Sequence, residues 1–315
     1  MPLLSAILGI KTPLLRTLVP CVGLAYAIQA GSALPSIAFR TERFFDTSAF
    51  LTYLSCTGLS LYLPAALDAR AAGAAAPSLL GALAAPSSLN WRRAAVSAAA
   101  AAWSVRLGGY LLARITADGG RDARFDDIRG RPGKFAGAFA AQGTWVAVTL
   151  LPVLAVNAVP AGAAPAGLLL TDVAGAAMWA VGFGVEALAD GQKSRWKRDK
   201  EEKRHAEEFI TSGLWGRSRH PNYFGEILLW TGVATWAGGL VVRDTVLKGL
   251  GLSLGLGSRL SMLGLVFASP ALVTLLLTKA TGIPIIENKY DKKYGHRADY
   301  QAWKENTPVL VPKLF

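Results

Sequence analysis

Long apolar stretches alternate with short charged segments along most of this 315-residue chain. A helix that crosses a membrane needs about 20 mostly apolar residues. Seven stretches reach that length, so the pattern predicts an all-α polytopic bundle of about seven transmembrane helices. These stretches lie at residues 12–32, 48–68, 94–114, 137–157, 166–188, 223–243 and 259–279.

A stretch rich in alanine, glycine, proline and serine, residues 69–90, predicts a low-complexity loop after the second span. We therefore expect an N-terminal part, residues 1–92, made of transmembrane helices and this loop. Residues 93–315 would form the main transmembrane domain, which ends in a C-terminal tail. The tail is amphipathic, and one interpretation is a helix that lies on the membrane surface.

The charge is low and unevenly distributed. Only 17% of the residues are charged, against about 25% in soluble domains, and the net charge is +12. Four segments, with Arg114 and Lys279 at their edges, hold 24 of the 33 Lys and Arg residues. Seven spans would put these segments on one side, which the positive-inside rule makes the cytosol. The segments are 33–47, 115–136, 189–222 and 280–315.

This distribution explains most of the basic excess as a topology signal and places the C-terminus in the cytosol. Binding to nucleic acid is therefore not expected, although attraction for a phosphate-bearing ligand stays compatible with the same residues. Cys21 and Cys56 lie inside apolar stretches without metal-ligand spacing. We expect them to be packing residues, and we expect no metal site.

Four ionisable residues follow the end of the fifth span at helical spacing: Glu186, Asp190, Lys193 and Lys197. Steps of four, three and four residues place them in one stripe on a helix. One interpretation is a solvated helix end with ion pairs. The other is a polar cavity, which Glu186 favours because ionisable groups at membrane depth usually face a cavity or a partner.

The third span carries a similar stripe, formed by Trp103, Arg106, Tyr110 and Arg114. Arg106 lies well inside the apolar stretch, where a lone arginine can extend its side chain to the membrane surface. The alternative is an ion pair with Glu186 or Glu226 inside the bundle, which would mark a buried polar site.

The sequence SRHPNYFGEILLWTG, residues 218–232, brings polar groups to the start of the sixth span. The residue before a proline prefers extended backbone, and proline suits the first turn of a helix. We therefore expect His220 at the helix entrance and Pro221 at its first position. Asn222 and Glu226 then lie one turn apart on the same face.

A helix N-terminus with basic neighbours favours an anion, because its backbone N–H groups lack intrahelical acceptors. Arg217, Arg219 and His220 add cationic donors here. Together with Asn222 and Glu226, they suit a ligand that carries phosphates and an amide or ribose. In the tail, His296 and Tyr300 are expected to share one helix face at i,i+4.

Three motifs in order carry a family resemblance: EALADGQKSRWK, GLWGRSRHPNYFGEILLWTG and YGHRADYQAWKENTPVLVP. Together they resemble the C-terminal domain of the steroid 5-alpha-reductase group, and the nearest branch is domain of unknown function 1295. The resemblance covers roughly residues 100–315. The wider group includes sterol C14 reductases and isoprenylcysteine carboxyl methyltransferases.

The resemblance implies a helix bundle that holds NADPH at its cytosolic side and reduces a conjugated carbon–carbon double bond of a lipid ketone. The acid and tyrosine with which steroid-specific members polarise the ketone have no match here. Tyr110 and Tyr53 are therefore candidate proton donors, and the catalytic residues are expected to be Tyr110, Glu226 and Tyr300. Cofactor contacts are expected from Glu186, Asp190, Lys193, Lys197, Arg217, Arg219, His220, Asn222, Tyr223, Glu226, His296 and Tyr300.

The sequence thus favours an integral membrane, NADPH-dependent oxidoreductase that acts on CH–CH groups of a lipid or steroid-like enone. We expect a monomer in the endoplasmic reticulum. Two alternatives stay open. One is a membrane methyltransferase that uses S-adenosylmethionine, since that branch shares the Arg-His-Pro-x-Tyr pattern and the following glutamate. The other is a non-enzymatic lipid-binding protein that kept the fold.

Overall fold

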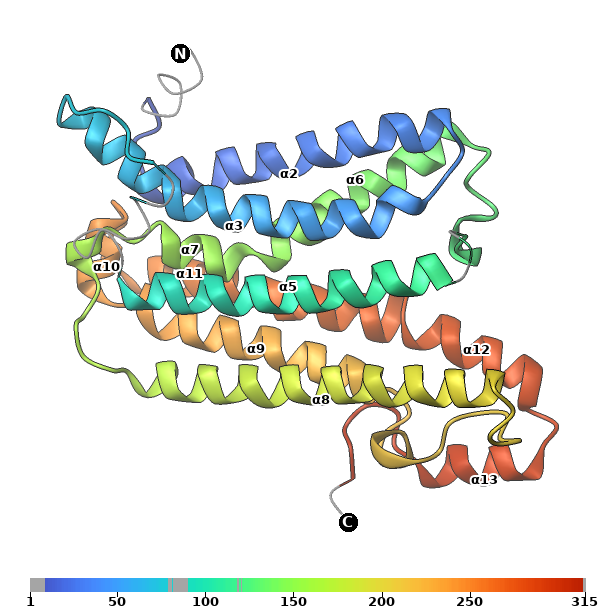
Figure 1. Ribbon diagram of the computed structural model, residues 1–315. Helices are drawn as coiled ribbons and strands as arrows, with labels where there is room; N and C mark the ends of the chain where they lie inside the picture. The colour runs from blue at the N-terminus through green and yellow to red at the C-terminus, as the bar shows by residue number, and fades with distance from the viewer. Residues whose placement is uncertain (1–8, 79–80, 82–89, 118, 120, 314–315) are drawn as a thin grey trace. The chain divides into compact units, whose positions relative to one another are not determined.

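The computed structural model describes residues 9–78, 81, 90–117, 119 and 121–313. These residues form helices and no β-strand (Figure 1), which confirms the all-α class that the apolar pattern predicts. The expected loop at residues 69–90 begins only after α3, at residue 72. Within that loop, residues 79–80 and 82–89 lie outside the described part of the chain.

All seven apolar stretches fall on helices. The long helices are α2 (Pro13–Ala38), α3 (Arg43–Ala71), α5 (Trp91–Ala117), α6 (Pro132–Thr149), α8 (Leu170–Glu201), α9 (Pro221–Val241) and α11 (Leu256–Leu275). The shorter helices are α7 (Leu151–Asn157), α10 (Asp244–Gly249), α12 (Ile283–Tyr294) and α13 (Ala298–Asn306). Single helical turns occur at η1 (Ala123–Phe125), η2 (Ala161–Ala163), η3 (Gly213–Gly216) and η4 (Leu276–Ala280), the last of them a π-helix.

Within the described ranges, five helices are long and apolar enough to cross a membrane, or six if α6 and α7 form one span bent by 49°. Pro152 accounts for the bend, because proline lacks the N–H for the helical hydrogen bond and its ring clashes with the preceding turn. The seventh stretch corresponds to α5, which is long but less apolar, being rich in alanine and interrupted by arginines. The predicted count of seven spans is therefore not confirmed.

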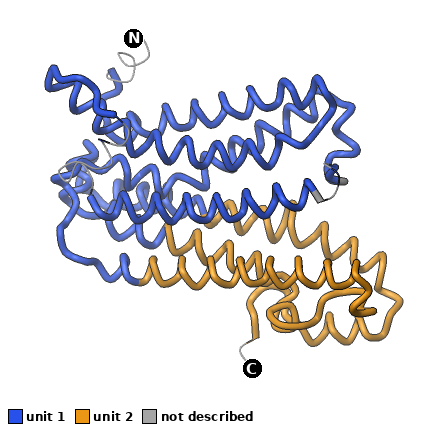
Figure 2. The backbone as a smooth tube through the Cα atoms, in the orientation of Figure 1, with its two compact units in different colours: residues 1–173, 234–269 blue, residues 174–233, 270–315 orange. Residues whose placement is uncertain are grey.

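The chain divides into two compact units (Figure 2). Unit 1 comprises residues 1–173 and 234–269, and unit 2 comprises residues 174–233 and 270–315. The helices α8, α9 and α11 each begin in one unit and continue into the other.

Unit 1 contains a buried polar network that joins α2, α3 and α6. Gln142 Nε2 donates to the Phe45 carbonyl at 2.8 Å and to Gln29 Oε1 at 3.1 Å. Gln29 Nε2 in turn donates to Thr52 Oγ1 at 2.9 Å. Because lipid offers no hydrogen-bonding partners, these groups satisfy one another and hold the three helices together.

A buried ion pair fixes the start of α8 in unit 1. Arg92 and Asp172 form a bidentate pair at 2.7–3.1 Å, and their side chains are only 1% and 2% exposed. The Arg92 guanidinium also donates to the carbonyl groups of Pro165 and Gly167, both at 2.6 Å. The loop before α8 is therefore held by a charge that is paired and fully hydrogen-bonded.

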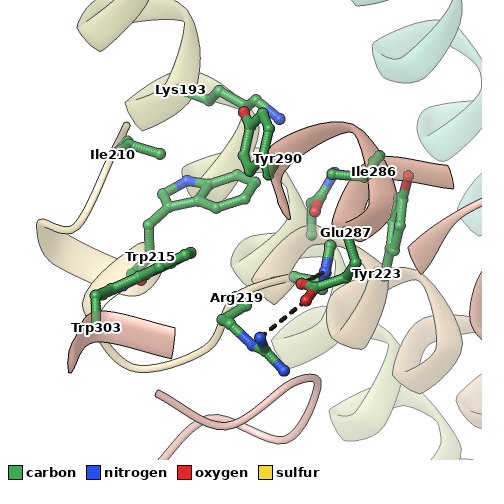
Figure 3. A pocket seen from close by; sticks show the side chains of 11 residues that line it. Lys193, Ile210, Trp215, Arg219, Tyr223, Ile286, Glu287, Tyr290 and Trp303 are labelled. Carbon is green, nitrogen blue, oxygen red and sulfur yellow. Dashed lines mark hydrogen bonds and ion pairs between the residues drawn. The ribbon is translucent and has the colours of Figure 1, made fainter. Parts of the chain in front are cut away.

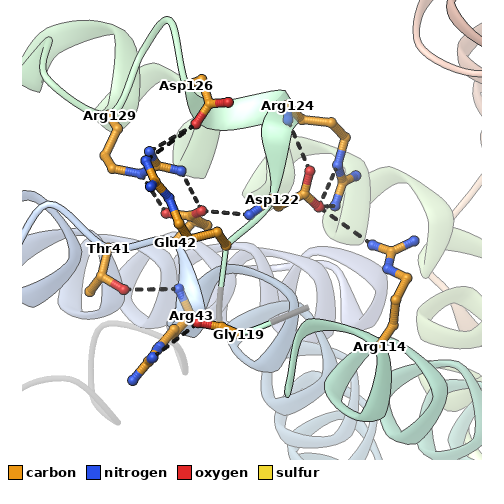
Figure 4. Close-up of polar contacts among 10 residues, drawn as sticks. Thr41, Glu42, Arg43, Arg114, Gly119, Asp122, Arg124, Asp126 and Arg129 are labelled. Atoms are coloured by element: carbon orange, nitrogen blue, oxygen red, sulfur yellow. Dashed lines mark hydrogen bonds and ion pairs between the residues drawn. The ribbon is translucent and has the colours of Figure 1, made fainter. Parts of the chain in front are cut away.

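A second charge cluster in unit 1 joins the α2–α3 connection to the segment after α5 (Figure 4). The Glu42 carboxylate accepts hydrogen bonds from Arg129, at 2.5 and 2.8 Å, and from the Asp122 backbone N–H at 2.7 Å. Burial alone raises the pKa of the Glu42 carboxyl. The bonds from Arg129 and Asp122, with the Arg129 charge, outweigh burial and hold that pKa below its ordinary value of 4.5.

Candidate functional site

Glycines bring α8 and α9 into direct backbone contact in unit 2. A Cβ atom on Gly182 would lie 2.5 Å from the backbone nitrogen of Leu229, and one on Gly225 would lie 2.6 Å from that of Glu186. Only glycine permits so close an approach of two helices. Gly182 lies about two turns from Asp190 on α8, and Gly225 lies about one turn from Asn222 on α9.

At this approach, polar side chains of the two helices meet. Asn222 Nδ2 donates to Asp190 Oδ1 at 3.3 Å. Asp190 is 5% exposed and Glu186, one turn earlier on α8, is 2% exposed. Buried ionisable groups of this kind are usually retained for a function, because burial alone disfavours their charge.

The turn before α9 has the geometry that its sequence predicts. The helix begins at Pro221, which confirms the expected entrance position of His220. The Ser218 hydroxyl accepts the His220 backbone N–H at 3.1 Å, and it donates to the Leu310 carbonyl at 2.7 Å. The C-terminal tail is thereby attached to the same turn that carries the basic residues.

A small pocket opens at this turn, entirely within unit 2 (Figure 3). Its cavity volume is about 30 Å³, above the roughly 10–15 Å³ that one water molecule needs. Four of its lining side chains are those of tryptophan or tyrosine, and three of its lining residues, one of these tyrosines among them, belong to α12. The lining residues are Lys193, Ile210, Trp215, Arg219, His220, Asn222, Tyr223, Ile286, Glu287, Tyr290 and Trp303.

One carboxylate pairs with the basic groups of the pocket. Glu287 of α12 contacts Arg219 Nη1 at 2.8 Å and His220 Nε2 at 2.9 Å, and Lys304 Nζ lies 3.6 Å away. The Arg219 side chain is 9% exposed and that of His220 is 4% exposed. Figure 3 shows the Arg219–Glu287 pair at the edge of the pocket.

Arg219 keeps one donor unused. Its Nε atom is buried, and within the described part of the chain no acceptor lies in hydrogen-bond range of it. A buried donor without an acceptor costs about 1–3 kcal/mol. Arg219 therefore has the capacity to donate to one further oxygen atom.

The comparison with protein families gives one result. Residues 69–307 match the family model described as "Protein of unknown function (DUF1295)". The chain belongs to the DUF1295 family. This confirms the branch that the sequence motifs resemble. Neither the curated proteins nor the solved structures include a match to the chain.

Five of the predicted cofactor contacts of this DUF1295 chain line the pocket: Lys193, Arg219, His220, Asn222 and Tyr223. They come from α8, from the turn before α9 and from the first turn of α9. The Lys193 ammonium lies 4.7 Å from the centre of the Trp215 ring, and the His220 and Tyr223 rings stack within 8° of parallel.

The other predicted contacts lie outside the pocket lining. Glu186, Asp190 and Glu226 lie on the facing helices α8 and α9, with Glu226 half-buried. Lys197 is exposed and lies 4.0 Å from Glu201, as in the alternative interpretation of a solvated helix end. Arg217 is also exposed.

The expected common helix face of His296 and Tyr300 is wrong. Gly295 ends α12, and Arg297 is extended, with φ −93° and ψ 130°, so α13 begins only at Ala298. His296 is thus an exposed residue of the connection. The i,i+4 rule requires both residues to lie in the same helix, and the extended backbone of Arg297 separates α12 from α13 here.

Tyr300 is buried in an aromatic cluster with Phe209, Tyr294 and Trp303, and it does not line the pocket. Its hydroxyl donates to Asp291 Oδ1 at 2.8 Å. Burial, followed by the bond to the Asp291 carboxylate, raises the pKa of the Tyr300 phenol. The phenol is therefore protonated over the physiological range.

The candidate proton donors Tyr110 and Tyr53 lie in unit 1, on α5 and α3. Tyr110 is half-buried on α5. Tyr53 is 2% exposed and packs edge-on against Trp103 and Trp145, with ring centres 5.1 and 5.3 Å apart.

The cysteines have the packing role that the sequence predicts. Both are free and buried, at 1% and 2% exposure. The Cys56 thiol donates to the Cys21 carbonyl at 3.2 Å, which links α2 to α3.

Sequence reasoning missed the contribution of α12 and of the tryptophans to the pocket. Glu287, Tyr290, Asp291 and Tyr294 recur at helical spacing and form one face of α12. That face was available as a signal, but the lysines between its members made the segment resemble a helix lying on the membrane. Trp215 gave no periodic signal, because it belongs to a single turn, η3.

Proposed function

We propose that this protein is an integral membrane reductase that uses NADPH to reduce a carbon–carbon double bond in a lipid-like enone. Three findings support the proposal: the DUF1295 membership, the membrane-length helices and the composition of the unit 2 pocket. The observation that carries it is the Asn222–Asp190 hydrogen bond beside a pocket rich in basic and aromatic side chains.

The donors of the pocket fit the parts of a dinucleotide. Arg219, with its unused Nε–H, and Lys193 suit phosphate oxygens. Asn222 offers a donor and an acceptor for a ribose hydroxyl or a carboxamide, and its bond to Asp190 orients that amide. The aromatic rings of Trp215 and Tyr290 suit a planar base.

NADPH, when bound, supplies the hydride that goes to the β carbon of the enone. The chain's own task is to orient the ligand, to exclude water and to donate a proton to the substrate. The Tyr300 hydroxyl already donates to Asp291. We therefore assign Tyr300 to holding the site in place and not to proton donation, and Glu226 to the same supporting role.

A binding experiment tests the proposal. The full chain, purified in a neutral detergent, is titrated with NADPH and, separately, with S-adenosylmethionine. We expect NADPH to bind and Asn222→Ala to weaken it about tenfold, since a hydrogen bond to a charged group contributes about 1.5–3 kcal/mol. Asn288→Ala, on the exposed side of α12, is the matched control and leaves the affinity unchanged.

Preferential binding of S-adenosylmethionine would overturn the reductase and favour the methyltransferase. Binding of neither compound, with lipid still bound, would favour a non-enzymatic lipid-binding protein. Once NADPH binding is established, its oxidation in the presence of enone lipids, compared with the saturated ketones, tests the reaction itself.

A further inference from the structure

The anion-binding groups at the start of α9 already hold an anion that belongs to the protein. Glu287 binds Arg219 through one carboxylate oxygen and His220 through the other. Its side chain is 19% exposed, so the pair is largely shielded from water. A phosphate accepts hydrogen bonds from the same donors as a carboxylate, and Glu287 therefore occupies a position suited to a phosphate.

Part of the pocket lining comes from the same part of the chain as Glu287. Ile286, Glu287 and Tyr290 belong to α12, and Trp303 belongs to α13. Pockets that hold drug-sized ligands usually measure about 300–1,000 Å³. A cavity of about 30 Å³ is far smaller, so a long ligand requires part of the lining to move. The part that carries the competing carboxylate is α12.

A second contact restrains α12 in its present position. Lys304 of α13 bonds Asp291 at 2.5 and 2.7 Å and also lies 3.6 Å from Glu287. Glu287 thus lies among Arg219, His220 and Lys304. If a more highly charged anion replaces the Glu287 carboxylate, Arg219, His220 and Lys304 each keep an anionic partner.

We propose that Glu287 is an internal competitor for the anionic end of the ligand, and that a diphosphate-bearing ligand binds by displacing Glu287 and releasing α12. The inference rests on the proposed function for the identity of the whole ligand, but not for its diphosphate. The buried Nε–H of Arg219 favours the diphosphate over Glu287, because it offers the additional oxygens a donor that the carboxylate leaves unused.

The competition has a direct electrostatic consequence. Glu287 lowers the positive potential that an incoming anion meets at Arg219. A glutamine at this position keeps the side-chain oxygen and the size but removes the charge. We take a distance of about 5 Å between the Glu287 carboxylate and the bound anion, and an effective dielectric constant of about 20. Removal of the Glu287 charge then strengthens anion binding by at least about tenfold.

The experiment compares the wild-type chain with Glu287→Gln and with Glu305→Gln, whose glutamate is exposed on α13. Each protein is titrated with inorganic pyrophosphate and with NADPH by calorimetry. We expect Glu287→Gln to bind pyrophosphate at least about tenfold more tightly, and Glu305→Gln to bind like the wild type. Equal or weaker binding by Glu287→Gln would show that Glu287 supports the site, and would overturn the proposal.

A measurement on the wild type covers the case in which Glu287→Gln does not fold. Saturating pyrophosphate should speed amide hydrogen exchange over residues 283–294, because α12 loses the Glu287 contact. Unchanged or slower exchange in that segment would overturn the displacement. The effect is specific if segments such as residues 91–117 of unit 1 exchange at the same rate with and without pyrophosphate.

The two proposals fail in different ways. If neither protein binds NADPH, while pyrophosphate still binds Glu287→Gln more tightly, the reductase assignment fails and the competitor role stands. If NADPH binds the wild type, and Glu287→Gln changes neither affinity, the competitor role fails and the cofactor assignment stands.

Discussion

Asn222 and Asp190 lie 32 residues apart in the chain, and their side chains are 3.3 Å apart across the contact between α9 and α8. The hydrogen bond forms because Gly182 and Gly225, and not large apolar side chains, face each other within about two turns of it. The close packing of the two backbones thus brings the polar side chains of the site within hydrogen-bond distance. The predictions below test this arrangement and the charge clusters of unit 1.

Loss of the Asp190 carboxylate should destabilise unit 2. In Asp190→Ala the half-buried Asn222 amide loses its acceptor, at a cost of about 1–3 kcal/mol. The midpoint of thermal unfolding in detergent should fall accordingly. Asp127→Ala, which removes an exposed carboxylate, is the control. Equal midpoints for the two variants would show that the bond contributes nothing to stability.

A methyl group on Gly182 should separate α8 from α9. Its Cβ would lie 2.5 Å from a backbone nitrogen and 2.6 Å from a backbone oxygen, neither of which belongs to a flexible side chain. We expect Gly182→Ala to lose about 1–3 kcal/mol of stability and to weaken NADPH binding through Asn222. Gly184→Ala, two residues away on the same helix, has free space and should be neutral or slightly stabilising. A stable Gly182→Ala protein would contradict the close packing.

Removal of Arg92 should be among the most damaging single changes in unit 1. Arg92→Met leaves Asp172 buried and without its ionic partner, which typically costs about 3–5 kcal/mol. The double variant Arg92→Met/Asp172→Leu removes both charges and should recover much of that loss. Arg121→Met is the control, because the Arg121 side chain is 76% exposed. If the unfolding midpoint of the double variant is no higher than that of Arg92→Met, loss of the charge pair is not the cause of the destabilisation.

The Glu42 cluster should make stability depend on acid pH. The pKa of Glu42 is lower in the folded protein than its ordinary value of 4.5. The unfolded chain therefore takes up the proton first, and the stabilisation is complete above pH 4.5 and is lost as the pH falls through the folded pKa. Unfolding midpoints of the wild type and Glu42→Gln should differ at pH 7 and converge on acidification. A difference independent of pH would exclude ionisation of Glu42 as the cause, and Glu305→Gln controls for the change in net charge.

Local sequence patterns were sufficient to predict the helices and the residue at which α9 begins. A run of about 20 apolar residues has one low-energy structure in lipid, since only a helix satisfies all its backbone groups internally. All seven stretches are helical for that reason, although α5 is too weakly apolar to count as a span. Pro221 begins α9 because the restriction that proline imposes acts within two residues.

The stripe from Glu186 to Lys197 could also be predicted from the sequence, because it lies in a single uninterrupted helix. The predicted common face of His296 and Tyr300 was wrong because α12 ends before His296 and the extended Arg297 precedes α13. Spacing rules are reliable only where the helix is continuous, and composition does not establish that continuity in a segment as polar as the C-terminal tail.

The sequence by itself determined the helical class, the membrane-length segments and the basic and amide groups at Pro221, since each depends on neighbours within a few turns. Only the tertiary structure decided that Glu287, 67 residues after His220, would take the position of an anion between His220 and Arg219. Many carboxylates are available to a positive group, and the packing of α12 against the α9 turn selects one of them. That selection depends on contacts between segments distant in sequence, which no local pattern contains.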